Sequence, residues 1–428
     1  MNFVSMHNRI LNDFVYKRIE MEKNMEAYLD NAATTVVEDN VADLMLKVMK
    51  EDFGNPSSKH IKGMQGENYI KNANEIIASS MKVLPKEIVF TSGGTEANNM
   101  ALIGGALANQ RTGKHIISTA YEHASVYNPL LYLKELGFEI TFVGVDSLGH
   151  IKVDELLGAI REDTIIISMM YVNNEIGSIT DFENLIPKIR EKSPNVLIHV
   201  DAIQGYGKFK IFPKKLGIDM MSVSGHKFHG PKGSGFLFIK DKIKVKPIIF
   251  GGGQQKGMRS GTENVPAIAG LGQAVQNMYS DHEEKLKHLY ELKEHFVENV
   301  LKIEDVTVNA VDLEGIIDSE GVIQNQDAFK ENIRKTAPHI VSVSIKNIRS
   351  EVLLHALEDK GVYVSSGSAC SSNHPGLSGT LQAIGVAKDL LDSTVRFSFS
   401  VHTTKEELEY ACECMKEITP ILKKYVRR

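Results

Sequence analysis

Residues 222–235 read Ser-Val-Ser-Gly-His-Lys-Phe-His-Gly-Pro-Lys-Gly-Ser-Gly and hold Lys227 in a glycine-rich turn. Apolar runs typical of strands flank this turn, at 218–221 and 236–239. A lysine fixed between buried strands loses its proton more easily when it is desolvated and has cationic neighbours, and it can then attack carbonyl groups. His226, when charged, would be such a neighbour. Solvated turn lysines beside glycines are also common, so the turn alone leaves both interpretations open.

A nucleotide-binding phosphate loop is excluded at this turn. That motif requires Lys followed by Ser or Thr after its second glycine, whereas Pro231 follows Gly230 here. Ser224 and His226 nevertheless offer donors suited to a phosphate.

The composition is that of an ordinary globular chain of 428 residues, with 24% charged and 42% hydrophobic residues. This length suggests two or three domains. The net charge of −5 gives no general reason to expect a nucleic acid partner.

Three cysteines without paired spacing favour a reducing compartment. No apolar run approaches the roughly 20 residues that cross a bilayer, and the charged extension 1–27 lacks a secretory signal. We therefore expect a cytoplasmic protein without a membrane partner.

Short apolar runs alternate with amphipathic stretches over residues 35–282, which we expect to form the large domain. The expected strands are 86–90, 114–118, 164–168, 196–200 and 219–223, and the expected helices are 96–108, 128–136, 153–160 and 182–191. Such alternation predicts a mostly parallel sheet with both faces covered. Ligands bind these sheets at the carboxyl ends of the strands.

Polar clusters follow five of the expected strands. They are Thr91–Asn99, Glu122-His-Ala-Ser, Asn173-Asn-Glu, Asp201 and Lys227. Five such clusters at strand ends are hard to explain as scattered surface, so we expect one active site.

A long helix over 267–301 is expected to lead into a smaller α/β domain, made of residues 28–34 and 283–428. Its expected strands are 339–345, 362–365 and 394–399, and its expected helices are 351–359 and 405–425. The polar stretch 312–336 is interpreted as an inserted surface loop or helix.

Two clusters suit an aldehyde cofactor with a phosphate. Gly94 and Thr95 open a helix whose N-terminus would attract a phosphate, although Thr95 could merely cap that helix. Asp201 ends a buried strand, where a carboxylate needs a cationic partner. A pyridinium nitrogen is one such partner, and a helix N-cap is the alternative role for Asp201. Gln204, one turn on, could reach the phenolic oxygen of the cofactor.

Four further side chains are candidates with plainer alternatives. His123 could stack on a cofactor ring and exchange protons, but a lone histidine is more often structural. Asn174 could orient the cofactor or substrate. Thr262 follows Arg259 in a donor-rich glycine loop. Arg396 could clamp a carboxylate or form an ordinary salt bridge.

Cys370 lies in a loop of small residues with nothing to pack, as expected for an exposed sulfur nucleophile. By contrast, Cys412 and Cys414 belong to the C-terminal helix and are interpreted as structural or surface residues. No metal site is expected, although Cys370 could serve as a transient iron–sulfur ligand.

Nine motifs, in order from residue 28 to the C-terminus, resemble the cysteine desulfurases of the NifS and IscS type, in the class V aminotransferase group. They begin at Leu29, Gly54, Phe90, Glu122, Asn173, His199, Ser224, Arg259 and Ser366. The resemblance implies a fold-type I pyridoxal phosphate (PLP) transferase, with a mostly parallel seven-stranded sheet in the large domain. It also implies a homodimer that converts L-cysteine to L-alanine and gives the sulfur to an acceptor protein.

The resemblance also implies a role for each matching residue. Lys227 resembles the Schiff-base lysine, Asp201 the pyridinium partner, His123 the stacking histidine, Arg396 the carboxylate clamp and Cys370 the persulfide-forming nucleophile. Residues resembling the phosphate site are Gly94, Thr95, Ser224, Gly225 and His226, with Thr262 reaching the cofactor of the other subunit. Asn174 and Gln204 resemble the residues beside the cofactor phenolate.

Three questions stay open. The family often has glutamine at the position of Thr180 and glycine at that of Ser400, and these departures leave the acceptor, iron–sulfur cluster assembly or tRNA thiolation, undecided. A selenocysteine lyase or another PLP-dependent β-elimination enzyme is the alternative activity. A sulfur carrier that has lost turnover is the alternative from another class.

Overall fold

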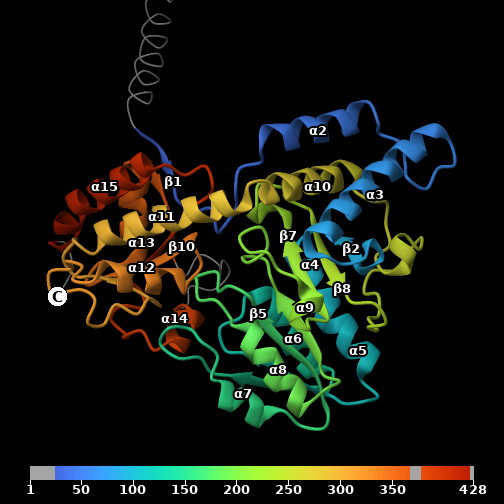
Figure 1. Cartoon of the computed structure of the whole chain (residues 1–428), viewed down its shortest axis with the longest axis horizontal. Helices are drawn as coiled ribbons and strands as arrows, with labels where there is room; N and C mark the ends of the chain where they lie inside the picture. The colour runs from blue at the N-terminus through green and yellow to red at the C-terminus, as the bar shows by residue number, and fades with distance from the viewer. Residues whose placement is uncertain (1–24, 367–376, 425–428) are drawn as a thin grey trace, which may run out of the picture.

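The computed structural model describes residues 25–366 and 377–424. Its largest feature is a seven-stranded sheet in the order β2, β8, β7, β6, β5, β3, β4 (Figure 1). The strands are β2 Ile88–Thr91, β3 His115–Thr119, β4 Glu139–Val143, β5 Thr164–Met170, β6 Leu197–Asp201, β7 Met220–Ser224 and β8 Gly235–Ile239. Within this sheet only β8 runs antiparallel to its neighbours. The expected fold class is confirmed.

Central and edge strands of this sheet differ in sequence character. All residues of β5 are buried, with Ile167 in one apolar core and Ile166 in another, on the opposite face. Such a strand reads as a continuous apolar run. The edge strand β4 is partly exposed, and Glu139 and Thr141 interrupt its apolar pattern. Because of these two polar residues, β4 was absent from the strands expected from the sequence.

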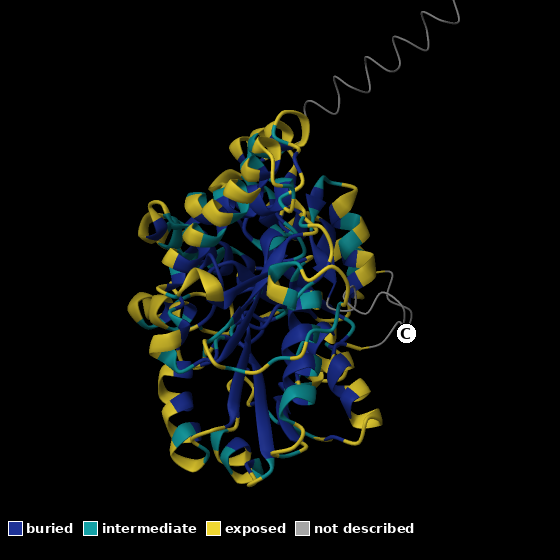
Figure 2. Cartoon of the chain, turned by 90° about the vertical axis from the view of Figure 1, so that its right-hand side faces the viewer, coloured by how far each residue is buried: buried dark blue, intermediate teal, exposed yellow. Residues whose placement is uncertain are grey.

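Helices cover both faces of the sheet (Figure 2). On one face lie α3 Ile61–Met81, α8 Phe182–Lys192 and α10 Val265–Tyr279, while α2 Asp39–Lys50 packs on α10. On the other lie α6 Ala124–Glu135 and one continuous helix composed of α4 Gly94–Asn99, a π-helical turn at Met100–Gly104 and α5 Gly105–Asn109. The short helices α7 Val153–Ala159 and α9 Pro213–Leu216 contact α8.

The prediction of a single continuous helix over 267–301 is wrong. The chain forms α10 and then α11 His282–Val300, and Asp281 between them has a left-handed backbone with φ 49°. Aspartate tolerates this conformation better than most residues, and apolar periodicity on both sides hides the break. As a result α11 leaves the large sheet and reaches the C-terminal elements (Figure 1).

The C-terminal elements have their own sheet and apolar core. Its four antiparallel strands lie in the order β12 Ser365–Ser366, β13 Thr394–Ser398, β10 Ile340–Ile345 and β9 Val306–Val308, and β1 Ala27–Tyr28 pairs beside them with β11 Val362–Tyr363. The helices are α11, α12 Gln326–Arg334, α13 Ser350–Glu358 and α15 Lys405–Lys423. The short helix α14 Gly379–Ala383 packs instead on the core of the large sheet through Leu381. Phe329 of α12 is buried in this core, so the stretch 312–336 contains a packed helix.

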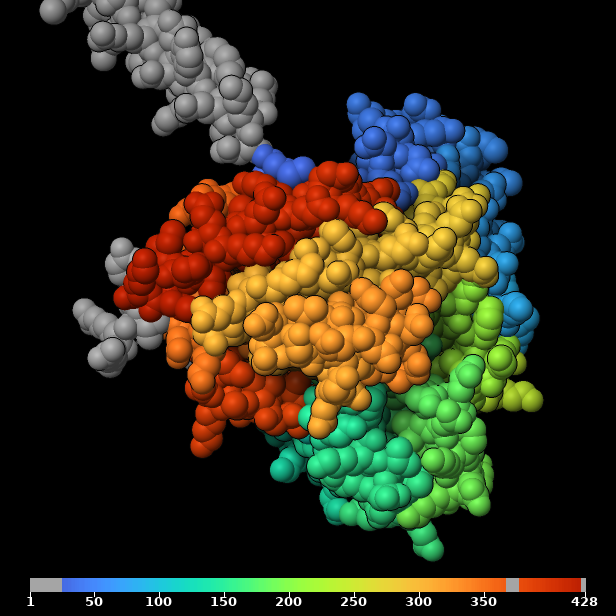
Figure 3. Space-filling model, turned by 60° about the vertical axis from the view of Figure 1, so that its left-hand side comes forward, coloured from blue at the N-terminus to red at the C-terminus, as the bar shows by residue number. Residues whose placement is uncertain are grey.

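The two sheets are joined by close backbone contacts. Ala337 N donates to Gly177 O at 2.7 Å, where C-terminal residues lie against the large sheet (Figure 3). Residues 30–38, here called the linking segment, run from the small sheet to the large one. Asp30 bridges to Ser398, and Thr35 N donates to His226 O at 2.9 Å. Within the described residues, no helix combines the length and apolar character needed to cross a membrane.

Candidate active site

Polar side chains from the carboxyl ends of several strands meet around one cavity of about 300 Å³. The sequence-predicted residues that line it are Gly94, Thr95, His123, Asn174, Asp201, Gln204, Ser224, His226, Lys227 and Arg396. All except Arg396 belong to the seven-stranded sheet or its connections. The position agrees with the general rule for ligand sites in such sheets.

Lys227 ends a 3-10 turn that directly follows β7. Its Nζ donates to the carbonyl oxygens of Ala32 at 2.7 Å and Ala33 at 2.8 Å, both in the linking segment. The amine is therefore held at the wall of the cavity. Lys208 Nζ donates to the Lys227 carbonyl oxygen, and burial, with the charge of Lys227, lowers the pKa of Lys208 to about 7.

His226 precedes Lys227 and would be its cationic neighbour only in the charged form. Burial and then the charges of Lys227, Lys232 and Lys208 lower the pKa of His226 to about 4. The ring is therefore neutral near pH 7, so the condition under which His226 would be a cationic neighbour is not met. Lys208 is the lysine that interacts electrostatically with Lys227.

Asp201 is the last residue of β6 and is buried. Asn98 Nδ2 donates to its Oδ2 at 2.8 Å, and the backbone N–H of Ile203 donates to its Oδ1 at 3.0 Å. Burial raises the pKa of Asp201, while these hydrogen bonds and the charges of His123 and Lys227 act in the opposite direction. A cation bound in the cavity would stabilise this carboxylate.

His123 has one ring nitrogen fixed by the backbone. It is the N-cap of α6, and its Nδ1 accepts from Ser125 N at 3.1 Å. The neutral ring therefore carries its hydrogen on Nε2. Burial lowers the pKa of His123, against the charge of Asp201. Asn98 Nδ2 also donates to Ser125 Oγ at 2.9 Å, so one amide group links the helix start to Asp201.

Arg396 reaches the cavity from β13 of the small sheet. Its Nη1 donates to Asn174 O and its Nη2 to Asp30 Oδ1, both at 2.8 Å. Its Nε is buried and has no hydrogen-bond partner among the described residues. An unsatisfied guanidinium donor suits a ligand with a carboxylate.

Glycines at the start of α4 leave room at the end of the cavity where a phosphate is expected from the sequence. A Cβ on Gly94 would lie 2.1 Å from Cδ1 of Ile203. Gly93 has φ 146°, a conformation that favours glycine. Gly94, Thr95, Ser224 and His226 also line a neighbouring cavity of about 380 Å³.

Four of the supporting residues were given no role of their own in the sequence analysis, although three of them lie within motifs that it names. They are Asn98, Ser125, Asp30, which pairs with Arg396, and His339, whose Nε2 lies 3.2 Å from Gln204 Oε1. Asn98 lies one helical turn after Gly94, so spacing could have indicated it. His339 and Asp30 carry no local signal, because their partners are far away in the sequence.

The structure does not bring every candidate into the cavity. Gly225 packs behind it, where a Cβ would lie 2.7 Å from Ser234 Oγ. Thr262 is exposed in a separate loop, beside Arg259, which pairs with Glu96 at 2.9 Å. Cys370 lies outside the described residues.

Cys412 and Cys414 are both buried in α15. Burial raises the pKa of the Cys412 thiol to about 12. Of the two interpretations given for this pair, the structural one is therefore right.

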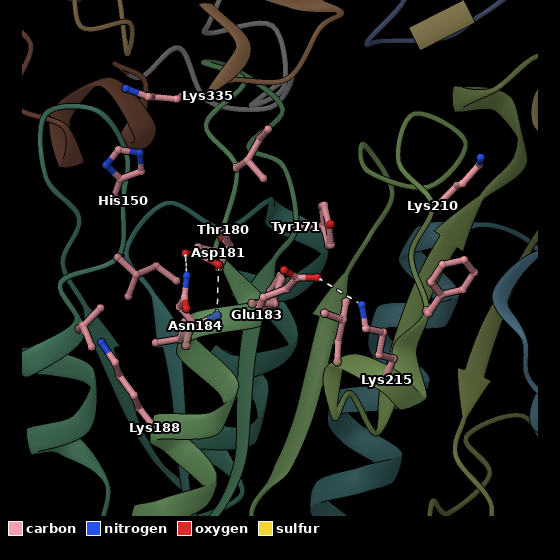
Figure 4. Close-up of a pocket in the computed structure, with 17 residues that line it drawn as sticks. His150, Tyr171, Thr180, Asp181, Glu183, Asn184, Lys188, Lys210, Lys215 and Lys335 are labelled. Atoms are coloured by element: carbon pink, nitrogen blue, oxygen red, sulfur yellow. Dashed lines mark hydrogen bonds and ion pairs between the residues drawn. The ribbon is translucent and has the colours of Figure 1, made fainter. Parts of the chain in front are cut away.

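A larger cavity of about 650 Å³ lies elsewhere on the large sheet (Figure 4). Its polar side chains include His150, Lys188, Lys210 and Lys335. Lys210 is engaged by Glu283 at 2.9 Å. Among the described residues, none of the predicted site residues lines this cavity. The smaller cavity is therefore the candidate active site.

Comparison with known proteins gives consistent matches over most of the chain. The family model described as aminotransferase class V matches residues 27–320 and 316–411. Cysteine desulfurase IscS of Dictyoglomus turgidum is 40% identical over 394 residues, covering 92% of this chain and 94% of the relative. The IscS of Methanosarcina thermophila is 38% identical, covering 94% of each.

Solved structures give the same result. A NifS-like protein has a TM-score of 0.83 and 34% identity, covering 93% of this chain and all of the other. A structure described as SspA in complex with cysteine has a TM-score of 0.71 and 30% identity, covering 88% of this chain and all of the other.

Proposed function

This chain belongs to the class V aminotransferase family and, within it, to the cysteine desulfurases, and from this membership we propose that it moves sulfur from L-cysteine to Cys370 and leaves L-alanine. The observation that carries the proposal is the single cavity that combines Lys227, the buried carboxylate of Asp201 and the unsatisfied Nε of Arg396. The resemblance expected from the sequence motifs is confirmed.

We propose that the cavity binds PLP, on which this family depends. The residues fit the cofactor: Lys227 would hold its aldehyde carbon, and Asp201 would pair with its ring nitrogen. Gly94, Thr95, Ser224 and His226 would surround its phosphate. When bound, PLP supplies an electron sink beside the substrate α carbon.

The chain's own side chains would bind the substrate and move its protons. Arg396 would bind the cysteine carboxylate and so orient the α carbon. The Lys227 amine, or His123 through Nε2, would carry the α proton. Both groups line the same cavity, as this transfer requires.

Cys370 would then take the sulfur. Its thiolate attacks the substrate sulfur, an S–S bond forms and the substrate C–S bond breaks. In sum, one cysteine and one Cys370 thiol give one alanine and one Cys370 persulfide. A reducing cytoplasm suits a thiol with this role, and an acceptor protein in iron–sulfur cluster assembly or tRNA thiolation would receive the sulfur.

The assignments can be tested with purified protein loaded with PLP. With L-cysteine and a thiol reductant, the wild type should release equal amounts of alanine and sulfide. C370S should keep the cofactor absorbance and lose at least 99% of sulfide release, whereas C414A should match the wild type, because Cys414 is buried in α15. Sulfide release by C370S at the wild-type rate would refute the nucleophile assignment.

Two further measurements test the cofactor and the substrate. Borohydride reduction followed by peptide mass spectrometry should find the cofactor on Lys227, and its absence from that amine would refute the cofactor site. Alanine release from selenocysteine, measured beside cysteine, separates a desulfurase from a selenocysteine lyase.

A further inference from the structure

Outside the cavity, three side chains from distant parts of the chain meet with their ligand atoms together. They are Glu38 at the start of α2, His229 two residues after Lys227, and His402 between β13 and α15. One ligand atom of each lies within 4.8 Å of those of the other two. We propose that Glu38, His229 and His402 form a binding site for one divalent transition-metal ion of the zinc class.

The hydrogen bonds of His229 leave its second nitrogen available for a metal. His229 Nδ1 lies 2.9 Å from Val36 O. A carbonyl oxygen only accepts, so Nδ1 carries the hydrogen and Nε2 of the neutral ring carries the lone pair. A histidine that donates one ring N–H to a backbone carbonyl is the usual arrangement of a metal ligand.

The backbone at His229 is also unusual. Its φ is 65°, in the left-handed region that few non-glycine residues adopt. His229 N donates to Thr35 Oγ1 at 2.7 Å, which holds the residue in this conformation. Residues kept in such a region often belong to functional sites.

Glu38 and His402 complete the ligand set. His402 Nε2 lies 3.3 Å from Glu38 Oε1, and the two imidazole rings are 4.8 Å apart. The other Glu38 oxygen accepts from Asn277 Nδ2, which fixes the carboxylate as an outer-shell partner would. Two imidazoles and one carboxylate are a known ligand set for Zn²⁺, with a fourth position for water.

The exposure of the three ligands fits entry of an ion from solvent. His229 is 2% exposed, whereas the side chains of His402 and Glu38 are 53% and 20% exposed. Zn–N bonds of about 2.0–2.1 Å require the ligand atoms to approach to roughly 3.3 Å. The exposed His402 can make most of this movement by rotating. A bound ion would join the Lys227 turn, α2 and the small sheet.

The site can be tested on the full-length PLP-loaded protein. After treatment with a chelator, Zn²⁺ or Co²⁺ is added, unbound metal is removed by gel filtration, and metal per chain is measured by mass spectrometry. We expect one ion per wild-type chain and an affinity at least tenfold weaker in H402A and E38Q. The control is H355A, because the His355 side chain is also exposed and pairs with Glu358 at 3.0 Å outside the cluster.

Two readouts separate this site from a cysteine site and from a merely structural cluster. Co²⁺ held by imidazole and carboxylate lacks the intense sulfur-to-cobalt charge-transfer band of a thiolate site. Zn²⁺ should raise the thermal unfolding temperature of the wild type and H355A but not of H402A. The proposal is overturned if no ion binds in stoichiometric amount, if H402A and E38Q bind as the wild type does, or if the cobalt spectrum shows thiolate ligation.

Discussion

Asp201 is a buried carboxylate held by Asn98 and the Ile203 backbone, and its charge is costly without a cation. Replacing it with asparagine keeps the shape but removes the charge that we propose pairs with the cofactor ring nitrogen. We expect D201N to bind PLP at least about 2 kcal/mol more weakly, or roughly thirtyfold. Equilibrium titration followed by cofactor absorbance measures this change.

The matched control for D201N is D219N. Asp219 is also buried and precedes β7, but its partners are Arg190 and Lys240. D219N should lower the stability to unfolding and leave the affinity for PLP unchanged. If D201N bound PLP with wild-type affinity, the assignment of Asp201 to the cofactor site would be refuted.

Glu122 gives a prediction about pH. Its Oε1 accepts from Met170 N at 3.0 Å, and its Oε2 is buried without a partner among the described residues. Burial raises the pKa of Glu122 from 4.5 to about 8. A carboxyl group whose pKa is raised on folding stabilises the folded state at pH values below its pKa in the unfolded chain. This contribution is lost as the pH rises to about 8, the pKa in the folded state.

The measurement compares unfolding free energies of the wild type and E122Q by denaturant titration. Between about pH 4.5 and 8, the wild type should lose stability relative to E122Q, by at most about 1.4 kcal/mol per pH unit. Above pH 8 the difference should be constant. Parallel curves across this range would contradict a protonated Glu122.

The N-cap residue of helix α6 has two roles, because His123 both caps the helix and lines the cavity. H123A should lose about 0.5–2 kcal/mol of stability with the cap. H123N should retain the cap, because asparagine is among the best N-cap residues. Both should lose about 10²–10⁴-fold in alanine formation if His123 moves a proton.

The two His123 variants together separate the structural role from the chemical one. Denaturant unfolding measures the cap, and initial rates of alanine release measure the chemistry. If H123N recovered both stability and rate, His123 would be a capping residue alone.

At the scale of the whole molecule, an apolar corner suits a second copy of the chain. The corner consists of Leu46, Met49, Phe53, Ile61 and Met64, from α2, α3 and the residues next to them, and each side chain is at least 46% exposed. Lys62 Nζ lies 5.8 Å from the centre of the Phe53 ring, so the two segments lie together. Exposed apolar clusters of this kind often mark interfaces.

We therefore expect a homodimer, with a mass by light scattering of about twice the 47.5 kDa of the chain. The double variant F53S/I61S should dissociate at least tenfold more readily. V322S is the control, since Val322 is 47% exposed elsewhere. A wild-type monomer at micromolar concentration would contradict the homodimer.

The sequence alone determined the α/β class and most strands of the large sheet, because buried parallel strands are continuous apolar runs. It also indicated which residue types share the site, since strand ends in a parallel sheet lie at one edge. The edge strand β4 was missed because Glu139 and Thr141 interrupt its apolar run. The break at Asp281 was missed because apolar periodicity continues on both sides of it.

Only the tertiary structure decided how these residues are held. Arg396 enters the cavity from another sheet, and Asn98 joins Asp201 to the start of α6. His226 is neutral because burial and nearby lysine charges lower its pKa. The cluster of Glu38, His229 and His402 joins residues up to 364 positions apart. Burial and long-range contacts depend on chain segments that are distant in sequence, so a local sequence pattern does not predict them.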